Sequence, residues 1–197
     1  MKNSSLALIA IVSIGGGGVA FTDGRSPTEP TGLESFIAQP TVVLDLAELV
    51  GTLESQDASV AVTVVIASDT ARPGERMRGL RFVMENNTGA GQAYLDEAQV
   101  ATLLDDLAGI EGGIAELEAG GDAPYRVQGT GACWMPTRPM RILCPSYRVG
   151  PDWTGMHLAV YGGRGFSYPG VRPSALAALV RQAVARLSAG APTGPIR

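Results

Sequence analysis

A long amphipathic pattern in the middle of the chain predicts a helix over residues 97–118. Its apolar side chains recur at intervals of three and four, which places them on one stripe of an α-helix. The stripe consists of Val100, Leu103, Leu104, Leu107, Ile110, Ile114 and Leu117. Asp96 stands at the cap position, and Gln99 can bond back to its backbone, as in a capping box. A helix of this length needs a partner surface to cover its stripe.

Alternating apolar residues before this helix predict β-strands. Residues 59–67 are apolar on both faces, which is typical of a central strand, and residues 78–85 and 92–95 alternate as well. Residues 41–53 fit either a helix or a strand, and we interpret them as an edge strand. The first half of the chain is therefore expected to form a sheet that runs into the long helix.

A second series of strands follows and ends in a second amphipathic helix over residues 173–187. These strands are expected at residues 125–134, 140–147, 156–161 and 165–168. A shift of 76 residues (179 minus 103) places Leu103 on Leu179 and superimposes the two helical stripes. We therefore expect an α+β fold with antiparallel sheets and two helices. It would form a single domain over residues 41–188, built from a duplicated strands-then-helix unit with halves at about 41–120 and 121–188.

The N-terminal segment is typical of a secretory signal. Lys2 precedes an apolar run over residues 6–14, and small residues end it at Ala20, after which we expect cleavage. An uncleaved anchor is the alternative, but the run is short for a membrane span. Export to the periplasm or outside the cell follows, with no membrane span in the cleaved protein. Residues 21–40 are proline-rich and are expected to form a flexible linker. Its one apolar island, Leu33 with residues 36–38, offers an alternative in which this part is attached to the domain. Residues 189–197 are expected to be a tail.

The charge of the chain argues against one class of partner. The sequence has 15 basic and 19 acidic side chains, a formal net charge of −4, and Lys2 is its only lysine. Phosphate backbones require a basic patch that this chain lacks, so we do not expect nucleic-acid binding. The partner is instead expected to be a protein or a small ligand.

The two cysteines, Cys133 and Cys144, are expected to form a disulfide. In a hairpin that turns at residues 137–140 they would lie directly across from each other, close enough to bridge, and an exported protein can keep such a bond. A metal site is the alternative, but the chain has one histidine and offers too few further ligands.

The segment from Met77 to Phe82, followed by Tyr94, Leu95 and Asp96, resembles a group of functionally uncharacterised exported bacterial proteins. In that group a strand that begins near a Gly-Leu-Arg sequence is followed by one that runs into an Asp-capped helix. Where the group has Asp-x-x-Glu, this chain has Asp96 and Gln99. The resemblance implies that residues 41–50 form a strand, and it implies no activity. In outline, a doubled unit of four strands and a helix is also similar to Whirly and Pur-type domains, whose nucleic-acid binding the charge of this chain does not favour.

The sequence contains no motif of a known catalytic, metal or phosphate site. Its single histidine, His157, lies in a predicted strand without a catalytic motif around it, so we expect no catalytic residue and no cofactor. The carboxylates of Asp105 and Asp106 fall opposite the helical stripe and are expected to be solvated rather than catalytic. A small hydrolase that uses His157 remains the alternative.

A concentration of aromatic and arginine side chains marks the candidate binding surface. It consists of Trp134, Arg138, Arg141, Tyr147, Arg148 and Trp153. Such residues are enriched at protein interfaces, although large aromatic side chains also belong in cores. We therefore expect a non-enzymatic binding or interaction module. A carrier of apolar ligands is a further alternative, with a cavity under Leu103, Leu107, Leu179 and Leu187.

Overall fold

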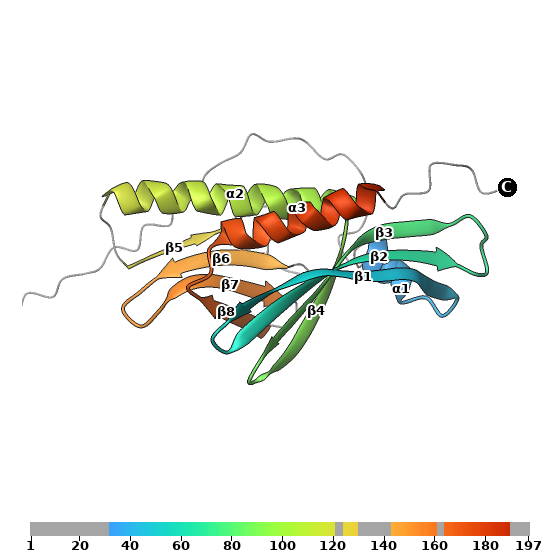
Figure 1. Cartoon of the computed structure of the whole chain (residues 1–197), viewed down its shortest axis with the longest axis horizontal. Coiled ribbons are helices and arrows are strands. Elements are labelled where there is room, and N and C mark those ends of the chain that lie inside the picture. The colour runs from blue at the N-terminus through green and yellow to red at the C-terminus, as the bar shows by residue number, and fades with distance from the viewer. Residues whose placement is uncertain (1–31, 121–123, 130–142, 161–163, 190–197) are drawn as a thin grey trace, which may run out of the picture.

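The computed structural model describes residues 32–120, 124–129, 143–160 and 164–189. Two four-stranded antiparallel sheets lie along one side of a pair of long helices (Figure 1). The strand orders are β1-β2-β3-β4 and β5-β6-β7-β8, so that each strand pairs with its neighbour in sequence. This architecture confirms the expected α+β fold with antiparallel sheets.

The first sheet contains the four strands expected before the long helix. They are β1 (Val42–Ser55), β2 (Ala58–Asp69), β3 (Arg76–Asn86) and β4 (Gly89–Asp96). The ambiguous segment after residue 40 is a strand at the edge of the sheet, as interpreted from the sequence. β2 is a central strand with both faces covered, since Val64 and Val65 on opposite faces are 1% and 0% exposed.

The helix after β4 is α2 (Glu97–Gly120). Its N-terminus has the expected reciprocal cap. The Gln99 backbone N–H donates to Asp96 Oδ1 at 3.0 Å, and the Asp96 backbone N–H donates to Gln99 Oε1 at 2.9 Å. These two bonds satisfy donors that a helix end leaves free.

The second sheet is described for β5 (Tyr125–Gln128), β6 (Cys144–Val149), β7 (Thr154–Val160) and β8 (Arg164–Pro169). The chain then enters α3 (Pro173–Ala189), with proline in its first turn as expected. The ends of the predicted strands between residues 130 and 142 lie outside the described residues, as do the predicted signal peptide and the tail beyond Ala189. The order of four strands and a helix therefore occurs twice, and a duplication of the sequence remains a hypothesis.

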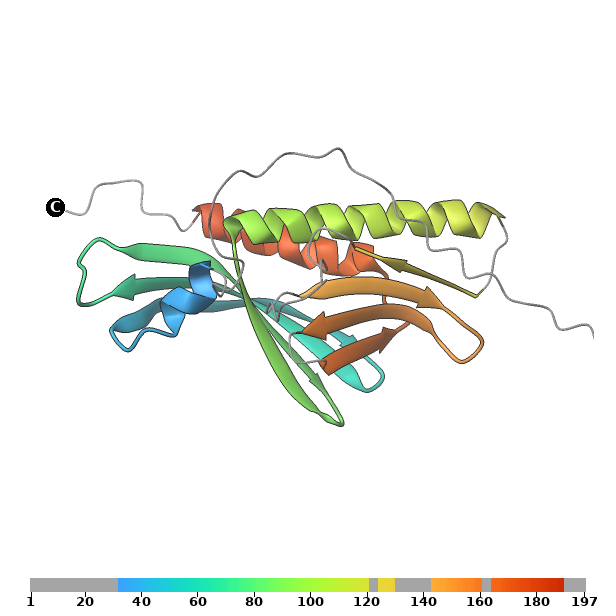
Figure 2. The same ribbon diagram turned by 180° about the vertical axis from the view of Figure 1, so that it is seen from behind.

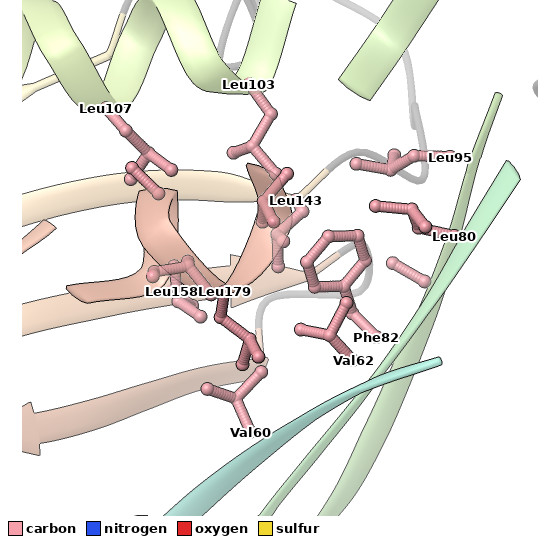
Figure 3. Close-up of a cluster of buried hydrophobic side chains, with 14 of the residues drawn as sticks. Val60, Val62, Leu80, Phe82, Leu95, Leu103, Leu107, Leu143, Leu158 and Leu179 are labelled. Carbon is pink, nitrogen blue, oxygen red and sulfur yellow. The ribbon is translucent and has the colours of Figure 1, made fainter. Parts of the chain in front are cut away.

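The core lies where both helices meet both sheets. α2 and α3 run in opposite directions side by side, and Figure 3 shows Leu103 and Leu107 of α2 close to side chains from α3 and both sheets. Phe82 of β3, Leu158 of β7 and Val180 of α3 are each 0% exposed. The apolar stripes of the helices are thus covered by one shared core, which the hydrophobic effect stabilises.

The two sheets also contact each other directly. A Cβ atom on Gly91 of β4 would lie 3.0 Å from the ring of Phe166 in β8, so a side chain at this position would require the ring to shift. The Tyr168 hydroxyl donates to the Ser59 carbonyl at 3.2 Å, and the Ser55 hydroxyl donates to the Pro169 carbonyl at 2.8 Å. The two halves of the chain are therefore in direct contact through their sheets as well as through their helices.

The predicted flexible linker over residues 21–40 is wrong at its C-terminal end, because α1 (Gly32–Ile37) packs onto the first sheet (Figure 2). Leu33 is 0% and Phe36 3% exposed. The Leu33 side chain lies over Gly79, where a Cβ atom would be 2.7 Å from it, on the sheet face away from α2 and α3. The apolar island therefore fixes this segment to the domain, because burying two large apolar side chains offsets the cost of ordering it.

The expectation for Asp106 is also wrong. Asp105 is exposed as predicted, but Asp106 is only 8% exposed and packs against Gly129, which follows β5. α2 contacts α3 and both sheets, so its buried arc is wider than a single stripe. Leu104 and Leu117, assigned to the stripe, lie at its margin and are half-buried.

Candidate functional site

The residues of the candidate binding surface do not share one environment. Trp134, Arg138 and Arg141 lie outside the described residues. Arg148 of β6 is exposed, and Trp153 in the turn after β6 is half-buried, with the Arg148 guanidinium 5.8 Å from the centre of its ring. This cation–π contact holds an arginine and an indole together at the surface.

The structure contradicts the assignment of Tyr147 to the candidate binding surface. Its side chain is 4% exposed and belongs to the core. Side chains alternate along a strand, so Ser146 and Arg148 point outward where Tyr147 points inward. Burial raises the pKa of the Tyr147 hydroxyl, although the nearby Arg172 opposes the shift. The Arg172 guanidinium lies 5.7 Å from the ring centre. Tyr147 is therefore a packing residue.

The face of the second sheet that points away from the helices carries the remaining polar residues, and we call it the outer face. Directly paired residues of neighbouring strands share a face. One row runs from Arg126 through Arg148 to Gly155, and the next row contains Gln128, Ser146, His157 and Ser167. The outer face consists of Arg126, Gln128, Cys144, Ser146, Arg148, Gly155, His157, Ala159, Gly165, Ser167 and Pro169.

Electrostatically, the outer face is unusual for an acidic protein, because none of these eleven positions is Asp or Glu. Arg126 and Arg148 are exposed and stand directly opposite each other on β5 and β6. Like charges at directly paired positions destabilise a sheet by roughly 0.2–1 kcal/mol. Arg126 Nη2 donates to the buried Ser146 hydroxyl at 3.3 Å, and within the described residues neither arginine forms an ion pair. Both cations therefore remain available to an anionic group.

His157 lies in the same face, beside these arginines. Its Nδ1 is 3.1 Å from the Ser167 hydroxyl, and its ring covers Gly165, where a Cβ atom would be 2.3 Å from Nε2. Burial, with a smaller effect of the Arg126 charge, lowers the pKa of His157 below its ordinary 6.5, so the imidazole is neutral at pH 7.

A catalytic dyad would require a group that orients the imidazole. The contacts and charges that the structure describes at His157 come from Ser167 and Arg126, and neither is a carboxylate. A neutral imidazole bound to a serine hydroxyl can donate or accept a hydrogen bond. In the described residues this arrangement therefore lacks the carboxylate that orients the histidine of a catalytic triad.

The residues that sequence reasoning missed are Arg126, Ser146 and Ser167. Each occupies an outward position in a strand that had been predicted, so the alternation within each strand was a usable signal. Their alignment in neighbouring rows depends on how β5 to β8 pair with one another. The alternation of residues within a single strand does not reveal that pairing.

The carrier alternative predicts a cavity under four leucines. Leu103, Leu107 and Leu179 instead pack with one another and with both sheets (Figure 3). A groove of about 270 Å³ lies at the side of the helix pair, with Leu104 and Leu187 in its walls and the ion pair between Arg78 and Glu97 among its lining residues. This groove is open to the surface rather than enclosed beneath the helices.

The described part of the chain offers no cluster of three or more His, Cys, Asp or Glu side chains that could hold a metal ion. Cys144 lies at the start of β6 and accepts a hydrogen bond from Gln128 at 3.6 Å. Its predicted disulfide partner, Cys133, lies outside the described residues, so the disulfide remains a prediction.

Comparison with known proteins gives no match: no family model, no curated protein and no solved structure resembles the chain significantly. Among the helices of the described ranges, none combines the length and apolar character needed to cross a bilayer. The chemistry of the site is that of a cationic and aromatic sheet face.

Proposed function

We propose that the protein is a non-enzymatic, exported binding module that docks an acidic peptide or protein segment on the outer face of the second sheet. One observation carries the proposal: two exposed arginines stand directly opposite each other on a face without carboxylates. A carboxylate of a partner between Arg126 and Arg148 would relieve their repulsion and gain charge-assisted hydrogen bonds.

The neighbouring groups fit the same partner. Trp153 supplies an aromatic surface beside Arg148, and arginine and aromatic side chains are those most often found at interface hot spots. His157 and Ser167 supply neutral hydrogen-bonding groups one row away. Two arginines are too few for a phosphate backbone or an anionic membrane, which bind larger basic patches.

Isothermal titration with poly-L-glutamate at low ionic strength tests the proposal, with poly-L-lysine as the opposite-charge control. We expect binding that weakens with added salt, because exposed charges are screened. Arg126→Gln and Arg148→Gln should each weaken binding about two- to fivefold, the scale of an exposed ion pair.

Arg181→Gln is the matched control variant, since Arg181 is an exposed arginine on α3, on the other side of the domain. It removes the same charge without touching the outer face and should leave the affinity unchanged. Equal losses in all three variants would reveal a response to net charge alone and would contradict the proposed site. A duplex of DNA that displaces poly-L-glutamate at equal charge concentration would contradict the choice of an acidic protein partner.

A further inference from the structure

The two arginines of the outer face extend in opposite directions along β6. Arg126 and Arg148 are paired across β5 and β6, so their backbones lie at the same level of the sheet. The Arg126 guanidinium reaches Ser146, two residues before that level, where Nη2 donates to the hydroxyl at 3.3 Å. The Arg148 guanidinium lies beside Gly150, two residues beyond that level, where a Cβ atom would be 3.2 Å from Nε. The two cationic groups are therefore separated along the strand.

Further contacts hold each arginine in its direction. Ser146 is 2% exposed, so the hydroxyl that binds Arg126 is fixed within the surface of the sheet. At the other position the centre of the Trp153 ring is 5.8 Å from the Arg148 guanidinium. The turn that carries this ring is closed by a bond from the Gly150 N–H to the Trp153 carbonyl at 3.1 Å. A return of both guanidinium groups to one level would break these contacts and bring like charges together.

A single carboxylate does not fit both cations in this arrangement. Ser146 and Gly150, which mark the two positions, are four residues apart, a separation of about 13 Å along a strand. A carboxylate is much shorter than this, so it can form short, charge-assisted hydrogen bonds with only one of the two guanidinium groups. One carboxylate placed between Arg126 and Arg148 would relieve their repulsion, but it would reach both only after they had left the contacts described above.

Both arginines retain the donors that two separate carboxylates need. An arginine side chain has five N–H donors, and the bond from Arg126 to Ser146 uses one of them. The contact between Arg148 and Trp153 is a cation–π contact, which leaves the N–H groups at the edge of the guanidinium for a carboxylate. The outer face therefore offers two cationic subsites, one at each arginine.

We infer, on the basis of the proposed function, that the outer face binds two carboxylates of one extended acidic segment, four residues apart, one at Arg126 and the other at Arg148. Side chains four positions apart in an extended chain share a face and are separated by about 13 Å, which matches the spacing of the subsites. A segment rich in acidic residues favours such a chain, because its charges repel one another. Acidic residues three positions apart would lie on opposite faces, so only one of them could bind.

NMR titration at low ionic strength with capped, threonine-rich peptides tests this inference. One peptide carries two glutamates four positions apart, and a control peptide of the same length and charge carries them three positions apart. We expect the first to bind about two- to fivefold more tightly, the gain from one more exposed ion pair. Arg126→Gln and Arg148→Gln should each abolish this preference, because one subsite is lost, whereas Arg181→Gln should retain it.

Circular dichroism of each variant establishes that the fold is intact. Equal affinities for the two peptides, or no binding of either, would overturn the inference. So would a preference that survives both Arg126→Gln and Arg148→Gln. If poly-L-glutamate still bound in these cases, the proposed function would stand without the two-subsite arrangement. A protein that does not bind poly-L-glutamate would contradict the proposed function and this inference together.

Discussion

Glu111 of α2 accepts the backbone N–H of Ser174 at 2.7 Å, so that one helix caps the N-terminus of the other. The same carboxylate lies 3.4 Å from Arg172, the residue just before α3. A negative charge at this end of α3 is favourable because the first turn of a helix presents free N–H groups and a positive dipole end. The contact connects the two halves of the chain outside the apolar core.

Removing this cap should destabilise the domain. We expect Glu111→Ala to lower the free energy of unfolding by about 1 kcal/mol, the usual cost of losing a helix cap. Chemical denaturation at pH 7 measures it. Glu116→Ala is the control, because Glu116 is exposed on the same helix and should cost little.

The acid dependence of that contact follows from the pKa of Glu111. Burial alone would raise this pKa, but the bonds from Ser174 and the charge of Arg172 outweigh burial and hold it below the usual 4.5. A depressed pKa stabilises the folded state above the ordinary value and loses that effect as the pH falls through the folded value. The stability difference between the protein and Glu111→Ala should therefore shrink below about pH 4.5. A difference that is the same at pH 7 and at pH 3 would contradict this role of the carboxylate.

Two of the described glycines should respond in opposite ways to substitution by alanine. A Cβ atom on Gly155 of β7 would lie 2.3 Å from the Tyr168 carbonyl oxygen and 2.9 Å from Pro169 Cα, whereas one on Gly109 of α2 would meet nothing within 4 Å. Gly155→Ala should destabilise the domain by about 2 kcal/mol or more, because backbone atoms must move apart. Gly109→Ala should stabilise it by about 0.5–1 kcal/mol, since alanine is the better helix former. Thermal unfolding of both variants checks the pair, and a loss of stability in Gly109→Ala would mean that α2 is covered at that position.

The sequence predicted the elements of the fold because the signals for them are local. The cap at Asp96 and the alternation of β2 each depend on residues within one helix or strand, and both were confirmed. The failures all involve a second element. Asp106 is buried because β5 and the residues after it approach α2, which no periodicity within the helix records.

The candidate site shows the same limit. The aromatic and arginine content of β6 and the following turn was visible in the sequence, and Arg148 and Trp153 do lie together at the surface. Tyr147 was misplaced because composition was read without the alternation of the strand. The opposition of Arg126 to Arg148 depends on the pairing of two strands separated by 15 intervening positions, from 129 to 143, and only the register reveals it.

The docking of α1 provides a test of where the domain begins. Leu33 is fully buried on the first sheet, away from the main core. We expect Leu33→Ala to lower the free energy of unfolding by about 2–4 kcal/mol, as for other buried leucines. Ile37→Ala is the control within the same helix, because Ile37 is only half-buried and should cost less. If residues 32–37 were a linker, the two variants would be equally and nearly neutral in denaturant unfolding.

The half-buried His157 should make the stability of the domain depend on pH near neutrality. Its pKa is lowered first by burial and then by the charge of Arg126, so the folded state holds the proton less tightly than the unfolded chain does. Between the folded pKa and the ordinary 6.5 the unfolded chain therefore binds more protons, and stability falls as the pH decreases through this window.

Replacement of the ring by an amide in His157→Gln removes the titrating group and should flatten that part of the profile. Thermal midpoints measured from pH 7.5 down to pH 5 for both proteins decide the matter, and Arg126→Gln should reduce the slope only in part, because burial is the larger cause. A pH profile that is the same in His157→Gln as in the unsubstituted protein would contradict this prediction. It would show that the imidazole is as well solvated in the folded protein as in the unfolded chain. The face around His157 would then be more open than its contacts with Ser167 and Gly165 indicate.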